Sequence, residues 1–209
     1  MCGIFCFYGF TNFKGDEVQK LSHRGPDSMK CSCVDSGLFF GFNRLMINGL
    51  NERSDQPLVI GDIHLICNGE IYNHKELYKK FDLGHLRQTD SDCEIICHLY
   101  KKFSIDRTLK LIRGEFAFVL YDSSESKLFA ARDPLGVRGL VYATGHEGPS
   151  FRDSESYVVF ASEMKAIQQY GKVKQFPPGT WWHSNFFTKY NNFRDIEITK
   201  DFPTLNKIR

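Results

Sequence analysis

The sequence lacks the features that would place it in a membrane, on nucleic acid or in the secretory pathway. None of its apolar runs is long enough to span a bilayer, and its first residues show no basic region followed by an apolar core. Its 27 basic and 25 acidic residues nearly balance, so nothing in the charge calls for nucleic acid or an anionic membrane surface. We therefore expect a globular protein of the cytoplasm.

Cysteine is present, but without the spacing of a disulfide framework or a zinc site. The seven cysteines are odd in number and scattered, which favours reduced thiols in a cytosolic compartment. The pairs Cys31 and Cys33, and Cys93 and Cys97, do not have zinc-ligand spacing, and the histidines form no ligand pattern with them. The sequence therefore predicts no metal site.

The composition is that of one folded domain with a large core. Of the 209 residues 42% are hydrophobic, and 19 Phe and nine Tyr are available to fill the interior. After about Tyr190 the chain becomes polar and aperiodic. We expect one domain over residues 1–190, followed by a linker or tail over residues 191–209.

Short apolar runs separated by turn signals predict an α+β protein. The expected strands cover residues 3–9, 29–34, 38–44, 57–60, 63–67, 115–122, 127–132, 139–143, 157–161 and 180–187. The expected helices cover residues 16–22, 74–81, 92–103, 106–112 and 162–171, with Asn73 and Ser91 or Asp92 as N-caps. Segments 23–28 and 68–73 are expected to be irregular. Because the strands are apolar on both faces, we expect sheet packed on sheet, with helices on the outer faces.

The first residues, Met1-Cys2-Gly3-Ile4-Phe5, carry a candidate nucleophile. The small second residue permits removal of Met1, and Cys2 would then carry a thiol and an α-amine a few bonds apart. The ordinary pKa values are about 8.5 for a thiol and roughly 7.7–8.0 for an α-amine, so a neutral amine can take the thiol's proton. One residue would thus supply both nucleophile and general base. The alternative is an ordinary second-position cysteine with no role.

Further motifs follow in a fixed order along nearly the whole chain. They are Cys2-Gly3-Ile4-Phe5, His23-Arg24-Gly25-Pro26-Asp27, Arg44-Leu45, Gln56-Pro57, Asn68-Gly69-Glu70-Ile71-Tyr72-Asn73, Ser91-Asp92-Cys93-Glu94, Gly114-Glu115-Phe116-Ala117-Phe118, Arg132-Asp133-Pro134-Leu135-Gly136-Val137-Arg138, Phe160-Ala161-Ser162-Glu163-Met164-Lys165 and Pro177-Pro178-Gly179. Together they resemble the class II, N-terminal-nucleophile glutamine amidotransferase domain. Within that class the chain is most similar to the glutaminase domain of glutamine-hydrolysing asparagine synthetases. The resemblance implies a four-layer αββα sandwich of the N-terminal-nucleophile hydrolase type.

The resemblance also assigns roles to particular residues, and the chemistry of amide hydrolysis agrees with them. Asn68 and Gly69 offer an amide donor and a backbone N–H for the oxyanion of the tetrahedral intermediate, and each such donor contributes roughly 3 kcal/mol. Glutamine is a zwitterion, so its pocket needs both charges. Arg44 would bind the carboxylate, and Asp92, with Glu70 beside it, would bind the ammonium group.

Each assignment has a structural alternative. Asn-Gly is a common turn, and a lone Arg or Asp is usually a solvated charge or a helix cap. The neighbouring Asp90 competes with Asp92 for the same role. His23 is a second candidate base, although the amine of Cys2 already fills that role. Segments 23–27 and 132–138 would be structural, or would take part in the pocket loop and in the contact to a partner domain. Glu115 stands where the family usually has an apolar residue.

The resemblance implies hydrolysis of L-glutamine to glutamate and ammonia through a thioester on Cys2, without a cofactor in this domain. The ammonia would supply ATP-dependent synthesis of asparagine from aspartate in a C-terminal domain that uses ATP and Mg²⁺. Its Ser-Gly-Gly-x-Asp-Ser loop is not among these 209 residues. Expected partners are L-glutamine, that synthetase domain and, as a candidate assembly, a second copy of the chain. Two alternatives stay open: an amidotransferase for another acceptor, and a catalytically silent domain that binds glutamine and regulates.

Overall fold

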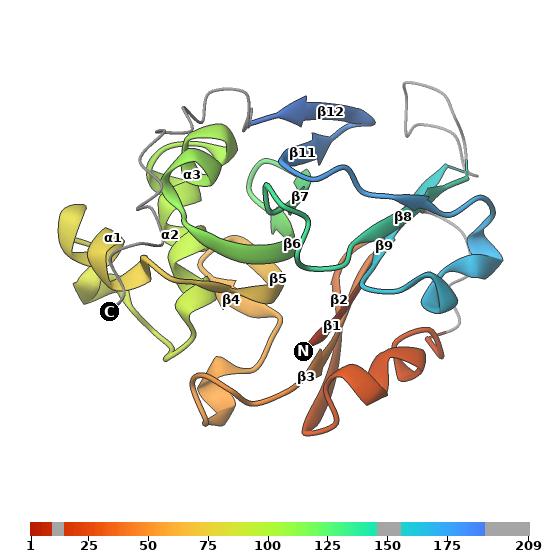
Figure 1. Cartoon of the computed structure of the whole chain (residues 1–209), viewed down its shortest axis with the longest axis horizontal. Coiled ribbons are helices and arrows are strands. Elements are labelled where there is room, and N and C mark those ends of the chain that lie inside the picture. The colour runs from red at the N-terminus through yellow and green to blue at the C-terminus, as the bar shows by residue number, and fades with distance from the viewer. Residues whose placement is uncertain (10–14, 146–155, 191–209) are drawn as a thin grey trace, which may run out of the picture.

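The computed structural model describes residues 1–9, 15–145 and 156–190, which form two antiparallel sheets of six strands each (Figure 1). In spatial order, the first sheet comprises β10 (Lys174–Gln175), β8 (Val141–Thr144), β9 (Tyr157–Ala161), β1 (Gly3–Gly9), β3 (Leu38–Arg44) and β2 (Ser28–Asp35). The second comprises β12 (Phe186–Lys189), β11 (Thr180–His183), β7 (Lys127–Arg132), β6 (Gly114–Asp122), β5 (Ile63–Ile71) and β4 (Leu58–Ile60).

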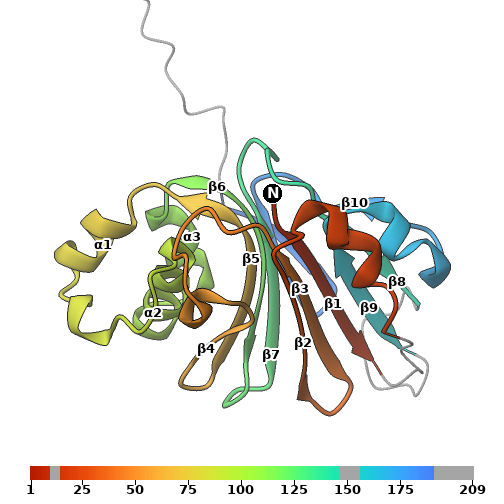
Figure 2. The same ribbon diagram turned by 90° about the horizontal axis from the view of Figure 1, so that it is seen from below.

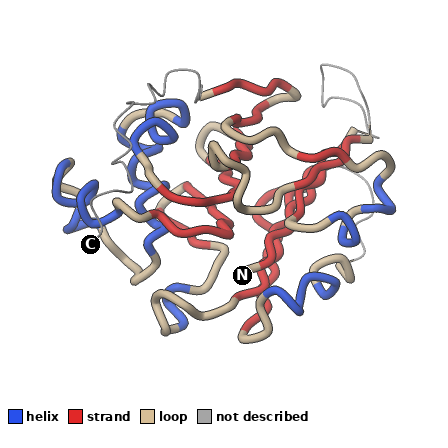
Figure 3. Tube along the Cα trace, in the orientation of Figure 1, coloured by secondary structure: helices blue, strands red, loops and turns tan. Residues whose placement is uncertain are grey.

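The two sheets stack face to face, and helical segments cover both outer faces (Figure 2). The second sheet is covered by α1 (His74–Lys80), α2 (Ile95–Lys102) and α3 (Ile105–Leu111). The first is covered by short 3-10 helices, including η1 (Gln19–Arg24), η5 (Met164–Ala166) and η6 (Gln168–Tyr170). The tube view separates the same helical and strand segments (Figure 3). The predicted four-layer α+β sandwich is therefore confirmed. Within the described residues, no helix is both long enough and apolar enough to cross a membrane.

Alternation along the strands divides the apolar side chains between three buried layers. On β1, Ile4 and Cys6 belong to the core between the sheets, whereas Phe5 and Phe7 pack under the 3-10 helices. β6 divides its side chains in the same way, with Val119 between the sheets and the residues on either side of it under α1–α3. Strands apolar on both faces are what a four-layer sandwich requires.

Strand β5 is longer than the sequence predicted, and this carries the central motif into the sheet. Residues 68–71 do not leave the strand but pair with β6 as far as Ile71, opposite Gly114. Asn73 precedes α1 as predicted, but its side chain does not cap the helix. It donates to the Leu111 carbonyl at 3.0 Å and accepts from Arg113 N at 2.8 Å. These long-range bonds satisfy the amide better than a local cap would.

Three further segments differ from expectation. Residues 23 and 24, predicted to be irregular, complete η1. The helix predicted over 162–171 is two 3-10 turns, because Ser162 Oγ instead accepts from Ile4 N at 3.0 Å and Ile167 leaves helical geometry at φ −129°. The strand predicted over 180–187 folds back as the hairpin β11–β12. Ser184 and Asn185 both have positive φ, which is the geometry of a two-residue hairpin turn.

Ser91, rather than Asp92, caps the segment leading into α2, since its side chain accepts a hydrogen bond from Cys93 N at 3.3 Å. The turn that follows, η4 (Asp92–Glu94), is a 3-10 helix and runs directly into α2. Residues 191–209 lie outside the described residues, so the expected linker or tail stays a prediction.

Candidate active site

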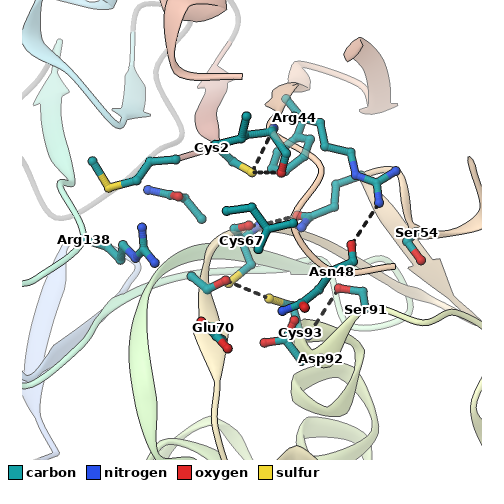
Figure 4. Close-up of a pocket in the computed structure, with 17 residues that line it drawn as sticks. Cys2, Arg44, Asn48, Ser54, Cys67, Glu70, Ser91, Asp92, Cys93 and Arg138 are labelled. Carbon is teal, nitrogen blue, oxygen red and sulfur yellow. Dashed lines mark hydrogen bonds between the residues drawn. The ribbon is translucent and has the colours of Figure 1, made fainter. Parts of the chain in front are cut away.

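A pocket lies where β1 begins and where β3 and β5 end, at one edge of the stacked sheets. Seventeen residues line it, and the close-up in Figure 4 draws them as sticks. The structure brings all six residues selected from the sequence to this one pocket: Cys2, Arg44, Asn68, Gly69, Glu70 and Asp92. His23 is not part of that lining, and its side chain is 51% exposed.

Cys2 is half-buried at the start of β1, and two other segments fix its position. Its Sγ accepts a hydrogen bond from Leu45 N at 3.4 Å, just after β3. Its carbonyl accepts from Arg24 Nε at 2.9 Å, from the end of η1. The pocket-facing thiol is thus held by residues 22 and 43 positions away in sequence.

Arg24 is itself held by an ion-pair network on the far side of the first strand. Its Nη1 lies 2.9 Å from Glu163 Oε1. His23 Nε2 lies 3.1 Å from the same oxygen, and Lys165 Nζ lies 3.3 Å from Glu163 Oε2. Burial raises the pKa of the Glu163 carboxyl, but hydrogen bonds from Arg24, His23 and Lys165 outweigh it and lower the pKa to about 2. Segment 23–27 therefore supports the N-terminus, which refines the structural role expected from the sequence.

Replacing Glu163 with Gln should lower the free energy of unfolding near neutral pH, because a neutral amide cannot pair with Arg24. A carboxyl whose pKa falls from 4.5 to about 2 on folding stabilises the protein above pH 4.5, and this stability is lost as the pH falls toward 2. Urea unfolding of both proteins across that range should show their difference shrinking on the acid side. A difference independent of pH would contradict the network.

The Cys2 thiol is not a preformed thiolate. Burial raises its pKa, and the Leu45 hydrogen bond and the positive N-terminus only partly offset this. A buried thiol with a raised pKa needs a base to take its proton. In a chain without Met1, the amine of Cys2 would lie a few bonds from its own thiol and would have a suitable pKa.

Asn68 has a buried side-chain donor without a hydrogen-bond partner. Its side chain is 1% exposed, and Nδ2 has no hydrogen-bond partner. Leaving a buried donor unpaired costs about 1–3 kcal/mol, so such a group usually has a function. Asn68 lines the same pocket as Cys2, so an unpaired amide donor and a thiol share one site.

Gly69 is required by strand packing. A Cβ at this position would meet the Glu115 carbonyl oxygen at 2.4 Å and the Cα of Phe116 at 2.7 Å. Any side chain here would therefore push β5 away from β6 and displace Asn68 with it.

Arg44 lines the pocket, but other parts of the protein already occupy its guanidinium. It is 4% exposed, and it bonds to the carbonyl oxygens of Asn48, Gly49 and Asn51 and to the Asp55 carboxylate. These acceptors all belong to segment 48–55, so Arg44 folds this segment against the pocket. Its assignment to a substrate carboxylate stays a prediction.

The acidic candidates are now distinguished by position. Asp92 is 5% exposed and lines the pocket, where its Oδ2 accepts from Ile71 N at 2.5 Å. Glu70 also lines the pocket and is exposed. Asp90 instead points to segment 48–55 and accepts from Asn51 Nδ2 at 2.7 Å. The described geometry thus favours Asp92 over Asp90.

The sequence offered a role in the pocket loop for segment 132–138, but it did not select Arg138 as a site residue. Arg132 and Asp133 fold the loop that carries it: Arg132 Nε donates to the Arg138 carbonyl at 2.7 Å, and Asp133 accepts from Arg138 N at 3.0 Å. The Arg138 side chain lines the pocket and pairs with Glu115 at 2.5 Å. Glu115, an acid where the motif usually has an apolar residue, is therefore explained by its ion pair with Arg138.

The described residues contain no group of three His, Cys, Asp or Glu side chains that could hold a metal ion. The site contains three thiols, an unpaired amide donor, two carboxylates and two arginines. This donor set suits acyl transfer at a small polar substrate.

Two stacked antiparallel sheets, with helices outside and a cysteine at the start of the first strand, define the N-terminal-nucleophile sandwich class. Two solved structures share the fold at 20% identity: glutamine phosphoribosylpyrophosphate amidotransferase of B. subtilis, with a TM-score of 0.67, and an allosteric regulatory enzyme of purine biosynthesis, with 0.69. Each match covers 91% of this chain and 49% of the other.

Sequence comparison gives the family. A model described as "Glutamine amidotransferase domain" matches residues 1–193, and the chain belongs to this family. It is 37% identical over 192 residues to a probable glutamine-hydrolysing asparagine synthetase of Acanthamoeba polyphaga mimivirus, covering 87% of this chain and 33% of that protein. It is 31% identical over 234 residues to the human asparagine synthetase, covering 100% of this chain and 40% of that protein. The chain thus spans about a third to two fifths of these relatives.

Proposed function

We propose that this chain hydrolyses L-glutamine to glutamate and ammonia, with Cys2 as nucleophile. The observation that carries the proposal is the unpaired, buried Nδ2 of Asn68 in the same pocket as the Cys2 thiol. Membership of the glutamine amidotransferase domain family supports glutamine as the substrate.

The reaction begins with transfer of the Cys2 thiol proton to its own α-amine. Sγ then attacks the side-chain amide carbon, and the oxyanion of the tetrahedral intermediate accepts hydrogen bonds from Asn68 Nδ2 and Gly69 N. Collapse returns the proton to the leaving nitrogen and releases ammonia, which leaves a glutamyl thioester on Cys2. Water then attacks the thioester, with the amine again taking the proton, and glutamate leaves.

Charge in the pocket fits the zwitterionic part of the substrate. Asp92 and Glu70 are the candidates for the ammonium group, and Asp92 is already oriented by its bond to Ile71 N. Arg44 is the candidate for the carboxylate. It would have to exchange contacts with the carbonyls of segment 48–51 for the substrate. Binding of glutamine would therefore change the position of segment 48–51.

A chain that retains Met1 should release no ammonia, because its Cys2 nitrogen is locked in a peptide bond and cannot act as base. Met1 also lines the pocket, so it would occupy space that the substrate needs. Mass measurement of the intact N-terminus, combined with a coupled assay for ammonia and glutamate, checks both points. A matched preparation with Met1 removed is the control. Equal turnover by the two forms would contradict the assigned base, and no turnover by either form would favour the silent, glutamine-binding alternative.

We further assign the ammonia to ATP-dependent synthesis of asparagine from aspartate. Support comes from the relatives named as glutamine-hydrolysing asparagine synthetases, which are longer than this chain. The partner would be a C-terminal synthetase domain that uses ATP and Mg²⁺, while the domain described here would need no cofactor. A homodimer stays a prediction. The seven cysteines are all free thiols, which supports a reducing, cytoplasmic location. Sequence beyond Arg209 that lacks a Ser-Gly-Gly-x-Asp-Ser loop would favour another acceptor.

A further inference from the structure

Three of the seven cysteines line the same pocket, and the proposed mechanism uses only Cys2. Cys67 lies on β5 immediately before Asn68, and Cys93 lies in η4 immediately after Asp92. The two unused thiols therefore flank the residues that would bind the oxyanion and the ammonium group.

Cys67 and Cys93 are neighbours in space. Cys93 Sγ lies 3.8 Å from the Gly69 carbonyl oxygen, and both cysteines, each 2% exposed, pack in the same buried cluster (Figure 4). A hydrogen bond with the Cys67 side chain, followed by burial, raises the pKa of the Cys93 thiol well above its ordinary value. The two side chains therefore line the same pocket from two neighbouring elements, β5 and η4.

We propose that Cys67 and Cys93 form a dithiol modification site that a small hydroperoxide entering the pocket oxidises to an intramolecular disulfide. The Cys67 sulfur attacks one peroxide oxygen, and the O–O bond breaks to give a sulfenic acid, while the thiol proton goes to the departing hydroxide and forms water. The Cys93 sulfur then attacks the sulfenic sulfur, and its proton leaves with the hydroxyl as a second water. Two thiols lose two electrons and one hydrogen peroxide gains them.

Apart from Cys2, which the proposed mechanism uses, the remaining cysteines lack one of the two requirements, which are access through the pocket and a neighbouring thiol. Cys6 and Cys97 are 0% exposed and do not line the pocket. Cys31 and Cys33 are exposed, but they are alternate residues of β2, and that separation along an extended strand keeps two sulfurs apart. Among the cysteines that the proposed mechanism does not use, position therefore selects Cys67 and Cys93.

The disulfide should weaken glutamine binding, a consequence that rests on the proposed function. A covalent bond draws the sulfurs closer than non-bonded contact, and so pulls η4 toward β5. Asp92 moves with η4, away from the geometry set by its 2.5 Å bond from Ile71 N. Conversely, bound glutamine covers the pocket floor and should slow oxidation of the dithiol.

The modification is tested on the Cys2→Ala chain, so that oxidation of the nucleophile does not intervene. After hydrogen peroxide treatment and tryptic digestion without reductant, peptides 54–75 and 88–101 should appear linked, and fragmentation should locate the bond at Cys67 and Cys93. Peptide 88–101 also contains Cys97, which provides a matched control. Adding Cys97→Ala should keep the link, and adding Cys93→Ala should abolish it. Absence of the link in the parent chain, or a bond through Cys97, would overturn the proposal.

Calorimetry with L-glutamine separates this inference from the proposed function. The reduced Cys2→Ala chain should bind glutamine, the oxidised chain should lose that binding, and dithiothreitol should restore it. No binding by the reduced chain counts against the proposed function, while the linked peptides still decide on the modification site. A disulfide that leaves glutamine affinity unchanged overturns the coupling between the two.

Discussion

Replacing Cys2 with Ala should abolish ammonia release from glutamine while leaving glutamine binding measurable. The substitution removes the sulfur that forms the proposed thioester, and loss of a nucleophile typically costs roughly 10⁶-fold in kcat. Binding should survive because Asp92 and Glu70, the proposed ammonium ligands, lie on other elements. A coupled glutamate assay measures the first effect, and calorimetry with glutamine measures the second.

Cys33→Ser is the matched control for this substitution. Cys33 is an exposed cysteine on β2, remote in sequence from the pocket lining, and its replacement should leave turnover unchanged. The parent enzyme should also show a glutamyl adduct on the N-terminal peptide when the reaction is quenched early, and the Cys2→Ala chain should not. Turnover retained in that chain would show that another group performs the attack.

The layered fold could be predicted from the sequence because it depends on local pattern. Runs such as residues 116–120 are apolar at successive positions, which is typical of a strand buried on both faces. The errors lie where long-range bonds replace local ones. Asn73 has the sequence of a helix cap, but it bonds to Leu111 and Arg113, whose proximity no local pattern reveals.

The site residues differ in how far the sequence alone could predict them, again because some depend on local motifs and others on long-range contacts. Asn68 and Asp92 stand in contiguous motifs, so sequence alone selected them. Arg24 acts on Cys2 through a backbone carbonyl, and Arg138 reaches the pocket only because Arg132 and Asp133 fold its loop. Arg44 was identified as a charge for the substrate, but the structure adds its hold on segment 48–55. Contacts of this kind depend on the packing of distant segments.

Replacing Asn68 with Ala should lower kcat by about 10²–10³, because one oxyanion donor is lost. The free energy of unfolding should change little, since Nδ2 has no partner in the folded protein and its removal breaks no hydrogen bond.

Asn43→Ala is the contrasting control: Asn43 is equally buried, but its Nδ2 donates to the Val18 carbonyl at 2.8 Å. That substitution should lower the free energy of unfolding by about 1 kcal/mol and leave kcat of the folded protein nearly unchanged. Steady-state kinetics and urea unfolding of both variants should therefore show opposite patterns, since a buried amide that is idle in the resting fold but needed in the transition state affects rate alone. If Asn68→Ala instead lost stability in proportion to activity, Asn68 would be a structural residue and the oxyanion would need another donor.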